Sequence, residues 1–176
     1  SAHNSIKLYR EAYGIWAVGG ILFNHESPRR GVGFVTRKIT NYLKNLIVTC
    51  DDTGIHYPKL KLGNIDSMRD WGYAKEYVEA MWLMLQQDTP KDYVIGTGET
   101  HSVKEFLEEV FKEFSKKGVE LPVNEFVEID ESNKRPAEVP YLKADPSLAE
   151  KELGWKAKTG FKELVELMVR EENGQE

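Results

Sequence analysis

The feature that most constrains the fold is an uninterrupted apolar run from Ile15 to Phe23. Its residues do not alternate between apolar and polar, so an extended segment here has no face suited to water. This pattern is typical of a strand that is buried on both faces, as in the parallel sheets of α/β proteins. The run is too short for a membrane helix, which needs roughly 20 apolar residues, and we expect no membrane association.

Helical and extended patterns alternate along the rest of the chain. The periodicity predicts helices at 34–46, 74–87, 103–117, 145–154 and 161–170, and strands at 60–62, 92–95 and 123–129. Segments 24–31, 51–58 and 130–140 are polar or rich in turn-forming residues and are expected to be loops. An alternating order of strands and helices predicts an α/β fold with parallel strands. We expect a single domain over residues 1–176, because no linker or repeat interrupts the pattern.

Several side chains are expected to begin helices. Ser102 and Glu105 have the spacing of a capping box. Asp145, which precedes Pro146, and Thr159 are expected to be N-caps of the two last helices.

We expect some apolar surface of this chain to remain unburied within a single copy. In the helix at 74–87, five apolar residues are expected to share one face: Tyr77, Val78, Met81, Trp82 and Leu85. Three or four strands would also leave a sheet edge open. We therefore expect either a homo-oligomer or a complementary N-terminal half as partner.

Charge is unevenly distributed. The 176 residues carry a formal net charge of −5, yet residues 1–63 hold nine Lys and Arg against four Asp and Glu, a local net charge of +5. Both an anion site in the first third and ordinary surface variation fit this distribution. Nucleic-acid binding by the basic segment is disfavoured, because the chain is acidic overall and carries no recognised nucleic-acid motif.

Cysteine, histidine and glycine patterns exclude several kinds of site. The single cysteine, Cys50, excludes a disulfide framework and fits a reducing compartment. The histidines show no metal-ligand spacing, so no metal site is expected. Gly96-Thr97-Gly98 is not a dinucleotide fingerprint, because His101 stands where the third glycine is required. We expect a strand-to-helix turn there.

Three arginine-bearing loops indicate a shared anionic ligand. The loop from Asn24 to Arg30 follows the apolar run, and ligands of open α/β sheets bind at the carboxyl ends of strands. Arg69 and Arg135 lie in two further polar segments. Because a guanidinium offers a bidentate fork for phosphate, we expect the three loops to meet around one anion.

Longer motifs resemble one known family. The segment 20–31, GILFNHESPRRG, and FVTRKI at 34–39 resemble the GDP-mannose 4,6-dehydratases. Further similar segments follow in the order of the family: LGNID at 62–66, RDWG at 69–72, GTG at 96–98, HSV at 101–103, RPAEV at 135–139 and LGWK at 153–156. The resemblance covers nearly the whole chain, but only the C-terminal half of the family.

The resemblance implies a fold and a reaction. The family belongs to the extended short-chain dehydrogenases/reductases, with an NADP-binding Rossmann half followed by a nucleotide-sugar-binding half. We therefore expect a partial Rossmann-like parallel sheet joined to the nucleotide-sugar-binding region, in a cytoplasmic protein. The implied reaction converts GDP-mannose to GDP-4-keto-6-deoxymannose for GDP-fucose biosynthesis. NADP takes hydride from C4, a base removes the C5 proton, water leaves from C6, and the hydride returns at C6.

The resemblance also implies the roles of individual residues. His25 and Arg30 are expected to contact NADP. Eight residues are expected to bind GDP-mannose: Asn24, Val35, Lys38, Leu62, Gly63, Arg69, Arg135 and Glu138. Lys7 aligns with the lysine of the catalytic Tyr-x-x-x-Lys motif, and His3 then stands at the tyrosine position.

Two functions remain open at this point. One is a GDP-mannose 4,6-dehydratase present as its substrate-binding half, which we expect to be inactive alone because the cofactor loop of the family has no counterpart here. The other is a non-catalytic module that binds GDP-sugars or assembles with another subunit.

Overall fold

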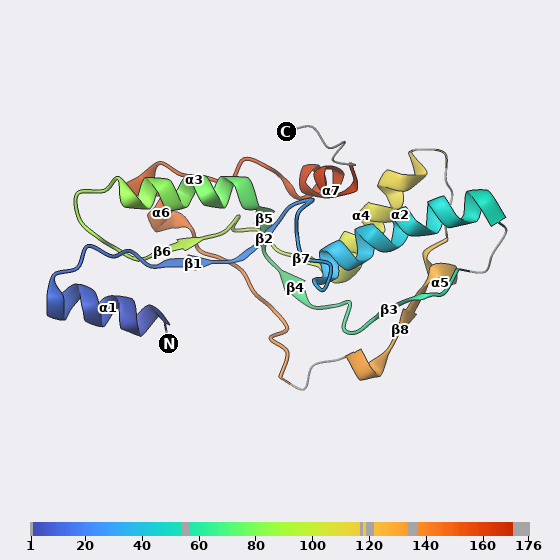
Figure 1. Ribbon diagram of the computed structural model, residues 1–176, viewed down its shortest axis with the longest axis horizontal. Coiled ribbons are helices and arrows are strands. Elements are labelled where there is room, and N and C mark those ends of the chain that lie inside the picture. The colour runs from blue at the N-terminus through green and yellow to red at the C-terminus, as the bar shows by residue number, and fades with distance from the viewer. Residues whose placement is uncertain (1, 54–56, 117, 119–121, 134–136, 171–176) are drawn as a thin grey trace.

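The computed structural model describes residues 2–53, 57–116, 118, 122–133 and 137–170 (Figure 1). Its helices are α1 (Ala2–Tyr13), α2 (Val35–Thr53), α3 (Ala74–Leu85), α4 (Val103–Ser115), α5 (Val123–Phe126), α6 (Ser147–Leu153) and α7 (Phe161–Val169), with one 3₁₀ turn, η1 (Glu131–Asn133). Its strands are β1 (Gly20–Leu22), β2 (Asn24–Glu26), β3 (Leu60–Leu62), β4 (Met68–Arg69), β5 (Trp71–Tyr73), β6 (Tyr93–Ile95), β7 (His101–Ser102) and β8 (Val127–Ile129).

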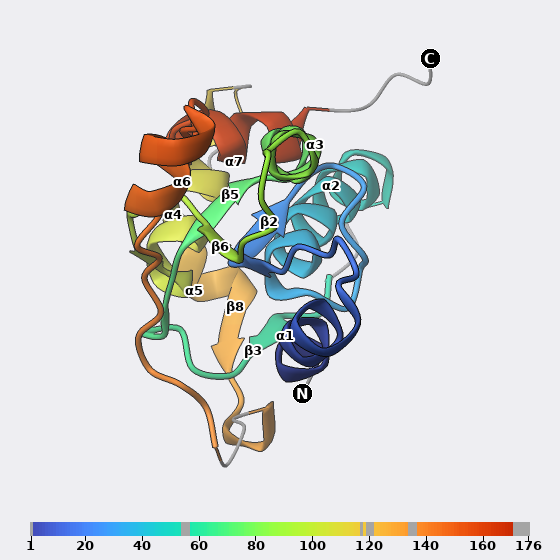
Figure 2. The ribbon, with the colours of Figure 1, turned by 90° about the vertical axis from the view of Figure 1, so that its left-hand side faces the viewer.

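The strands form pairs, most of them parallel. β1 pairs with β6, β2 with β5, and β3 with β8 in parallel, whereas β4 and β7 are antiparallel. Figure 2 shows the β3–β8 pair side by side. The chain passes from β1 to β2 through Phe23, whose N–H donates to the carbonyl of Ile95 at 2.9 Å. The predicted α/β fold with parallel strands is therefore confirmed.

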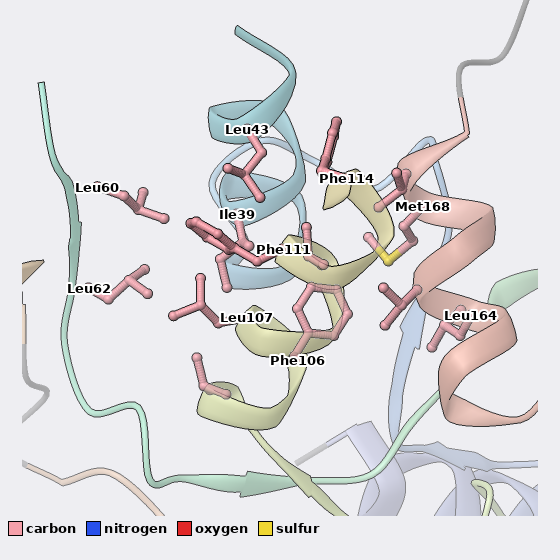
Figure 3. Packing of buried hydrophobic residues seen from close by; sticks show 14 of the residues in the cluster. Ile39, Leu43, Leu60, Leu62, Phe106, Leu107, Phe111, Phe114, Leu164 and Met168 are labelled. Atoms are coloured by element: carbon pink, nitrogen blue, oxygen red, sulfur yellow. The ribbon is translucent and has the colours of Figure 1, made fainter. Parts of the chain in front are cut away.

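Two hydrophobic clusters lie at opposite ends of the molecule. Helices α2, α4 and α7 surround the first, in which Ile39, Phe106 and Leu164 are completely buried (Figure 3). The second lies where α3 and α6 cover β6, around Tyr77 and Tyr93 (Figure 1). The strands β2, β4 and β5 run between the two clusters, so a hydrophobic cluster at each end of the molecule holds these central strands in place.

The apolar run that we expected to be buried on both faces is partly exposed. Only Gly20–Leu22 is extended, and Ile21 is 44% exposed. β1 pairs with β6 on one side, and within the described ranges no strand pairs with its other edge. Double burial is therefore wrong for β1 in this chain, because the neighbour that would cover it is not among the described strands.

Helix α3 also differs from the expectation of one apolar face. Tyr77 is completely buried, whereas Val78 and Trp82 are 62% and 61% exposed. Since Tyr77, Ala80 and Met84 form the buried stripe, the apolar residues occupy two faces of the helix. One face packs on β6, and the other is open.

Several local predictions are corrected by the structure. Helix α2 continues through Thr53, past the break expected at 51, because Asp and Thr weaken a helix only slightly and Gly54 comes later. The segment at 123–129 begins with one helical turn, α5, before β8. β2 occupies the expected loop at 24–31, and its polar sequence gives no apolar strand signal.

The predicted helix caps have mixed outcomes. The capping box of Ser102 and Glu105 is confirmed. Asp145 accepts a hydrogen bond from the N–H of Ser147, although Pro146 occupies the N-cap position. Thr159 is not the N-cap, because its hydroxyl donates to Glu76 and Gly160 occupies the N-cap position of α7.

No helix in the described part of the chain combines the length and the apolar character needed to cross a membrane.

Candidate functional site

A cavity of about 520 Å³ opens where the predicted binding loops converge. Nine of the ten residues implied to bind NADP or GDP-mannose line it: Asn24, His25, Arg30, Val35, Lys38, Leu62, Gly63, Arg69 and Glu138. The tenth, Arg135, lies outside the described residues. The chain thus brings together side chains that are more than 100 residues apart in sequence.

The topology explains this convergence. β1 ends at Leu22, and β3, which is paired in parallel with β8, ends at Leu62, so both strands place their carboxyl ends at the cavity. Helix α2 begins beside them, and its first turns contribute Val35 and Lys38. The Lys38 Nζ donates to the carbonyl of Lys61 at 2.6 Å, which holds the ammonium group beside β3.

Arg30 is held by three neighbours. Its Nη1 donates to the carbonyl of His25 at 3.1 Å, its guanidinium carbon lies 3.7 Å from the ring centre of Phe34, and its Nε lies 3.4 Å from Glu26 Oε2. Glu26 is buried behind it and accepts a hydrogen bond from Thr36 at 2.5 Å. These contacts fix a cation at the cavity wall.

Burial raises the pKa of the Glu26 carboxyl above its ordinary value. The hydrogen bond from Thr36 and the charge of Arg30 act in the opposite direction but do not cancel the effect of burial.

His25 has a fixed orientation. Its Nδ1 lies 2.9 Å from the carbonyl oxygen of Phe23, and because that oxygen only accepts, Nδ1 carries the proton in this contact. Its ring also packs against Tyr77, with 5.4 Å between ring centres. The imidazole therefore stands rigidly at the junction of β1 and β2.

Arg69 pairs with Glu138 across the cavity. Its Nη2 donates to Glu138 Oε1 at 3.2 Å, and its Nη1 donates to the carbonyl of Met68 at 2.8 Å. Both side chains are largely buried, with 14% and 25% exposed. Among the described lining residues Glu138 is the only carboxylate, beside Arg30, Lys38 and Arg69. The cavity is therefore cationic.

Asp70 fastens the backbone next to Arg69. It is completely buried, and its carboxylate accepts from Thr97 N–H, Thr97 hydroxyl, Gly98 N–H and Ala144 N–H. The amides of Thr97 and Gly98 are thus directed to this carboxylate, and the turn does not line the cavity. The expected strand-to-helix turn is corrected in one respect, because the turn leads from β6 into the two-residue strand β7 before α4 begins.

The residues of the implied catalytic motif lie away from the cavity. Lys7 is 61% exposed on α1 and lies 4.0 Å from Glu11, and His3 Nδ1 lies 3.6 Å from Asp92. Neither residue lines the cavity. The structure therefore does not bring Lys7 and His3 together with the other predicted site residues.

Some lining residues escaped the sequence prediction. Ser67 and Trp71 line the cavity together with Arg69. All three follow the period-two alternation of an extended chain, which is the signal that could have identified them. Phe34, Asn64 and Asn133 also line it. Across the described ranges, no group of three or more His, Cys, Asp or Glu residues is arranged to hold a metal ion.

Sequence comparisons agree on one family. The family model of GDP-mannose 4,6 dehydratase matches residues 1–168. GDP-mannose 4,6 dehydratase 1 of Arabidopsis thaliana is 54% identical over 172 residues, which are 98% of this chain and 45% of that protein. The human GDP-mannose 4,6 dehydratase is 47% identical over 173 residues, covering 92% of this chain and 45% of that protein. The chain thus spans about half the length of these relatives and matches their C-terminal half.

A solved structure of low sequence identity shares the fold. The dTDP-glucose 4,6-dehydratase from Bacillus anthracis, in complex with NAD, superimposes with a TM-score of 0.78 at 15% identity. The match covers 96% of this chain and 48% of that one. The two chains therefore share a fold over this part of the molecule.

Proposed function

The chain belongs to the GDP-mannose 4,6-dehydratase family, and from this premise we propose that its cationic cavity binds GDP-mannose. Residues 1–176 form one domain, the substrate-binding half of such an enzyme. The observation that carries the proposal is the convergence of Lys38, Arg69 and Glu138 on one cavity together with the β2 residues. Cationic groups suit a diphosphate, and a carboxylate accepts from sugar hydroxyls or guanine N–H groups.

The β2 side of the cavity suits a second phosphate-bearing ligand, NADP. Arg30 lines the cavity, and its guanidinium is held in place by Glu26, the carbonyl of His25 and the ring of Phe34. His25 lies beside it with its ring orientation fixed by Phe23. In the complete enzyme these two residues would hold NADP, which accepts hydride from the sugar and returns it. Their role in this chain is to position a phosphate and a sugar relative to each other.

The placement of Lys7 favours a second candidate function. Because Lys7 is exposed on α1 and does not line the cavity, the chain alone has the features of a non-catalytic GDP-sugar-binding module. Turnover then requires a cofactor loop and a base for C5 from outside residues 1–176. We place the protein in the cytoplasm.

The open surfaces are where such a partner would bind. Among the described strands β1 has a partner on one edge only, and its residue Ile21 is exposed, as is Trp16 just before it. Trp82 and Leu85 are exposed on α3. A second copy of the chain or a complementary N-terminal half would cover these apolar groups. The mass of the native particle, measured by light scattering with and without NADP, distinguishes a homo-oligomer from a monomer that awaits another subunit.

Calorimetric titration tests the binding proposal. We expect the chain to bind GDP-mannose and GDP more tightly than ADP, and Arg69→Ala to weaken the binding of both guanine nucleotides about tenfold or more. Arg170→Ala is the matched control, because Arg170 is exposed on α7 and pairs only with Glu166 among the described residues. Equal affinity for GDP and ADP, or no binding of either, would contradict the proposal.

An assay of turnover separates the two candidate functions. With GDP-mannose and NADP, the purified chain is expected to yield no 4-keto-6-deoxy product. Robust product formation by the chain alone would overturn the proposal of a non-catalytic module and restore a catalytic role to residues of this half.

A further inference from the structure

Ser67 is a buried polar residue in the wall of the cavity that no comparison assigns to a ligand. It is 1% exposed and lines the cavity just before β4. Its Oγ has no hydrogen-bond partner among the described residues. Buried hydroxyls are normally paired, because an unpaired one loses its interaction with water and gains nothing in return. An unpaired hydroxyl at a ligand cavity therefore indicates that its partner comes with the ligand.

The backbone around Ser67 fixes the direction of its side chain. The carbonyl of Ser67 accepts from Val103 N–H at 3.2 Å, and Met68 N–H donates to the carbonyl of Pro140 at 2.8 Å. Because side chains alternate along an extended segment, Ser67 lies on the same side as Arg69, which also lines the cavity. Asp70 points to the other side, where it accepts from Thr97.

No hydrogen bond within the described residues holds the Ser67 hydroxyl in its present rotamer. Its Oγ is closed to solvent in its present rotamer, and rotation about χ1 changes its direction without moving the backbone. Since Oγ makes no hydrogen bond among the described residues, this rotation breaks none. A ligand oxygen in the cavity would supply an acceptor that the rotated hydroxyl can reach.

We propose that Ser67 is a ligand-contacting residue whose hydroxyl donates to an oxygen of the diphosphate that Arg69 binds. The inference rests on the proposed function and extends it to a residue that the family resemblance does not imply to bind GDP-mannose or NADP. A hydroxyl donor beside a guanidinium suits an anionic oxygen, because both groups present hydrogens to it. Serine also occupies little space, so the diphosphate can approach the β4 backbone closely.

Titration of Ser67→Ala with GDP, GDP-mannose and guanosine tests the contact. We expect the affinity for GDP and for GDP-mannose to fall by the same factor, about tenfold, as for the loss of one hydrogen bond to a charged group. The affinity for guanosine, which has no phosphate, is expected to stay unchanged. Ser147→Ala is the matched control, because Ser147 is exposed and does not line the cavity. Loss of affinity for GDP-mannose alone would assign Ser67 to the sugar and overturn the diphosphate contact.

Stability measurements distinguish a binding role from a structural one. Removal of an unpaired buried hydroxyl is expected to leave the melting temperature of the ligand-free chain unchanged or slightly higher. A clear decrease in that temperature, or unchanged affinity for both nucleotides, would overturn the inference. The two proposals fail separately. If wild type binds GDP no better than ADP, the proposed function fails, whereas comparison of Ser67→Ala with wild type for either nucleoside diphosphate still decides the role of Ser67.

Discussion

Asp70 receives two hydrogen bonds from Thr97, one from the backbone N–H at 2.9 Å and one from the hydroxyl at 2.8 Å. The other carboxylate oxygen accepts from Gly98 N–H at 2.9 Å and Ala144 N–H at 3.1 Å. One side chain thus joins the β4–β5 junction, the turn after β6 and the segment that follows Glu138. Because Arg69 precedes Asp70, this junction also sets where Arg69 and Glu138 meet.

Asp70→Asn is expected to lower the free energy of unfolding by about 2–3 kcal/mol. An amide has only one acceptor oxygen, so its NH₂ group would face N–H or O–H donors that the carboxylate now satisfies. Urea denaturation followed by tryptophan fluorescence measures the change. The control is Asp66→Asn, at an exposed position nearby, which is expected to change the free energy by less than about 0.5 kcal/mol. Equal stability of Asp70→Asn and wild type would contradict the role of this junction.

Gly96→Ala tests the close packing of the segments that Asp70 joins, because the substitution adds a methyl group between them. A Cβ at this position would lie 2.3 Å from the Cβ of Ala144 and 3.3 Å from the Cβ of Phe23, and neither atom can move without its backbone. We expect a loss of about 1–3 kcal/mol, as for overpacked cores. Gly33→Ala is the matched control, because nothing lies within 4 Å of its added Cβ. A Gly96→Ala protein as stable as Gly33→Ala would show that the segments are not closely packed.

The parallel α/β class and the side of the cavity formed by Asn24–Arg30 could be predicted from local signals. Apolar runs, the capping box at Ser102 and the polar residues after Phe23 depend on neighbours in sequence, and short-range physics determines them. The family motifs then identified Lys38 and Glu138, which composition alone would not have selected.

The sequence predictions that were wrong or incomplete depend on contacts between segments far apart in the sequence. The exposure of Ile21 depends on which strand lies beside β1. The hydroxyl of Thr159 donates to Glu76 of α3 and does not cap the helix that follows it. Ser67 was missed because the strand that follows it has only two residues, so the alternation of Ser67, Arg69 and Trp71 is too short to stand out in the sequence. Ser67 lies in the cavity wall because β4, β7 and α4 meet there, and β4 is more than 30 residues away from β7 and α4 in the sequence.

Glu26→Gln is expected to reduce the pH dependence of stability. Burial raises the pKa of Glu26 above its ordinary value of 4.5, so the folded state holds the proton more tightly than the unfolded chain. The resulting stability is present below pH 4.5 and is lost as the pH rises through the folded pKa. Melting temperatures measured from pH 4 to pH 8 should therefore fall more for wild type than for Glu26→Gln. Glu99→Gln, at an exposed position, should follow the wild-type profile, and a Glu26→Gln profile parallel to wild type would contradict the assignment.

Asp92→Asn is expected to lower stability at neutral pH, where the ionised Asp92 stabilises the folded chain. We expect the effect to be confined to helix α1. Arg10 donates to both carboxylate oxygens of Asp92 at 3.0 Å and is the largest cause of the lowered pKa of Asp92, with a further hydrogen bond from Gly19 N–H. A lowered pKa gives stability that is present above the ordinary value of 3.8 and is lost as the pH falls through the folded value. The substitution should thus lower the melting temperature at pH 7, and its effect should decrease as the pH falls through the lowered pKa of Asp92.

The change should be local, because α1 buries none of its own residues and is held mainly by Arg10. Amide hydrogen exchange at pH 7 is expected to speed up over residues 2–13 in Asp92→Asn, while the amides of α4 keep their protection. Asp88→Asn is the matched control, since Asp88 is exposed in the loop between α3 and β6. Unchanged exchange in α1 would show that other contacts attach this helix.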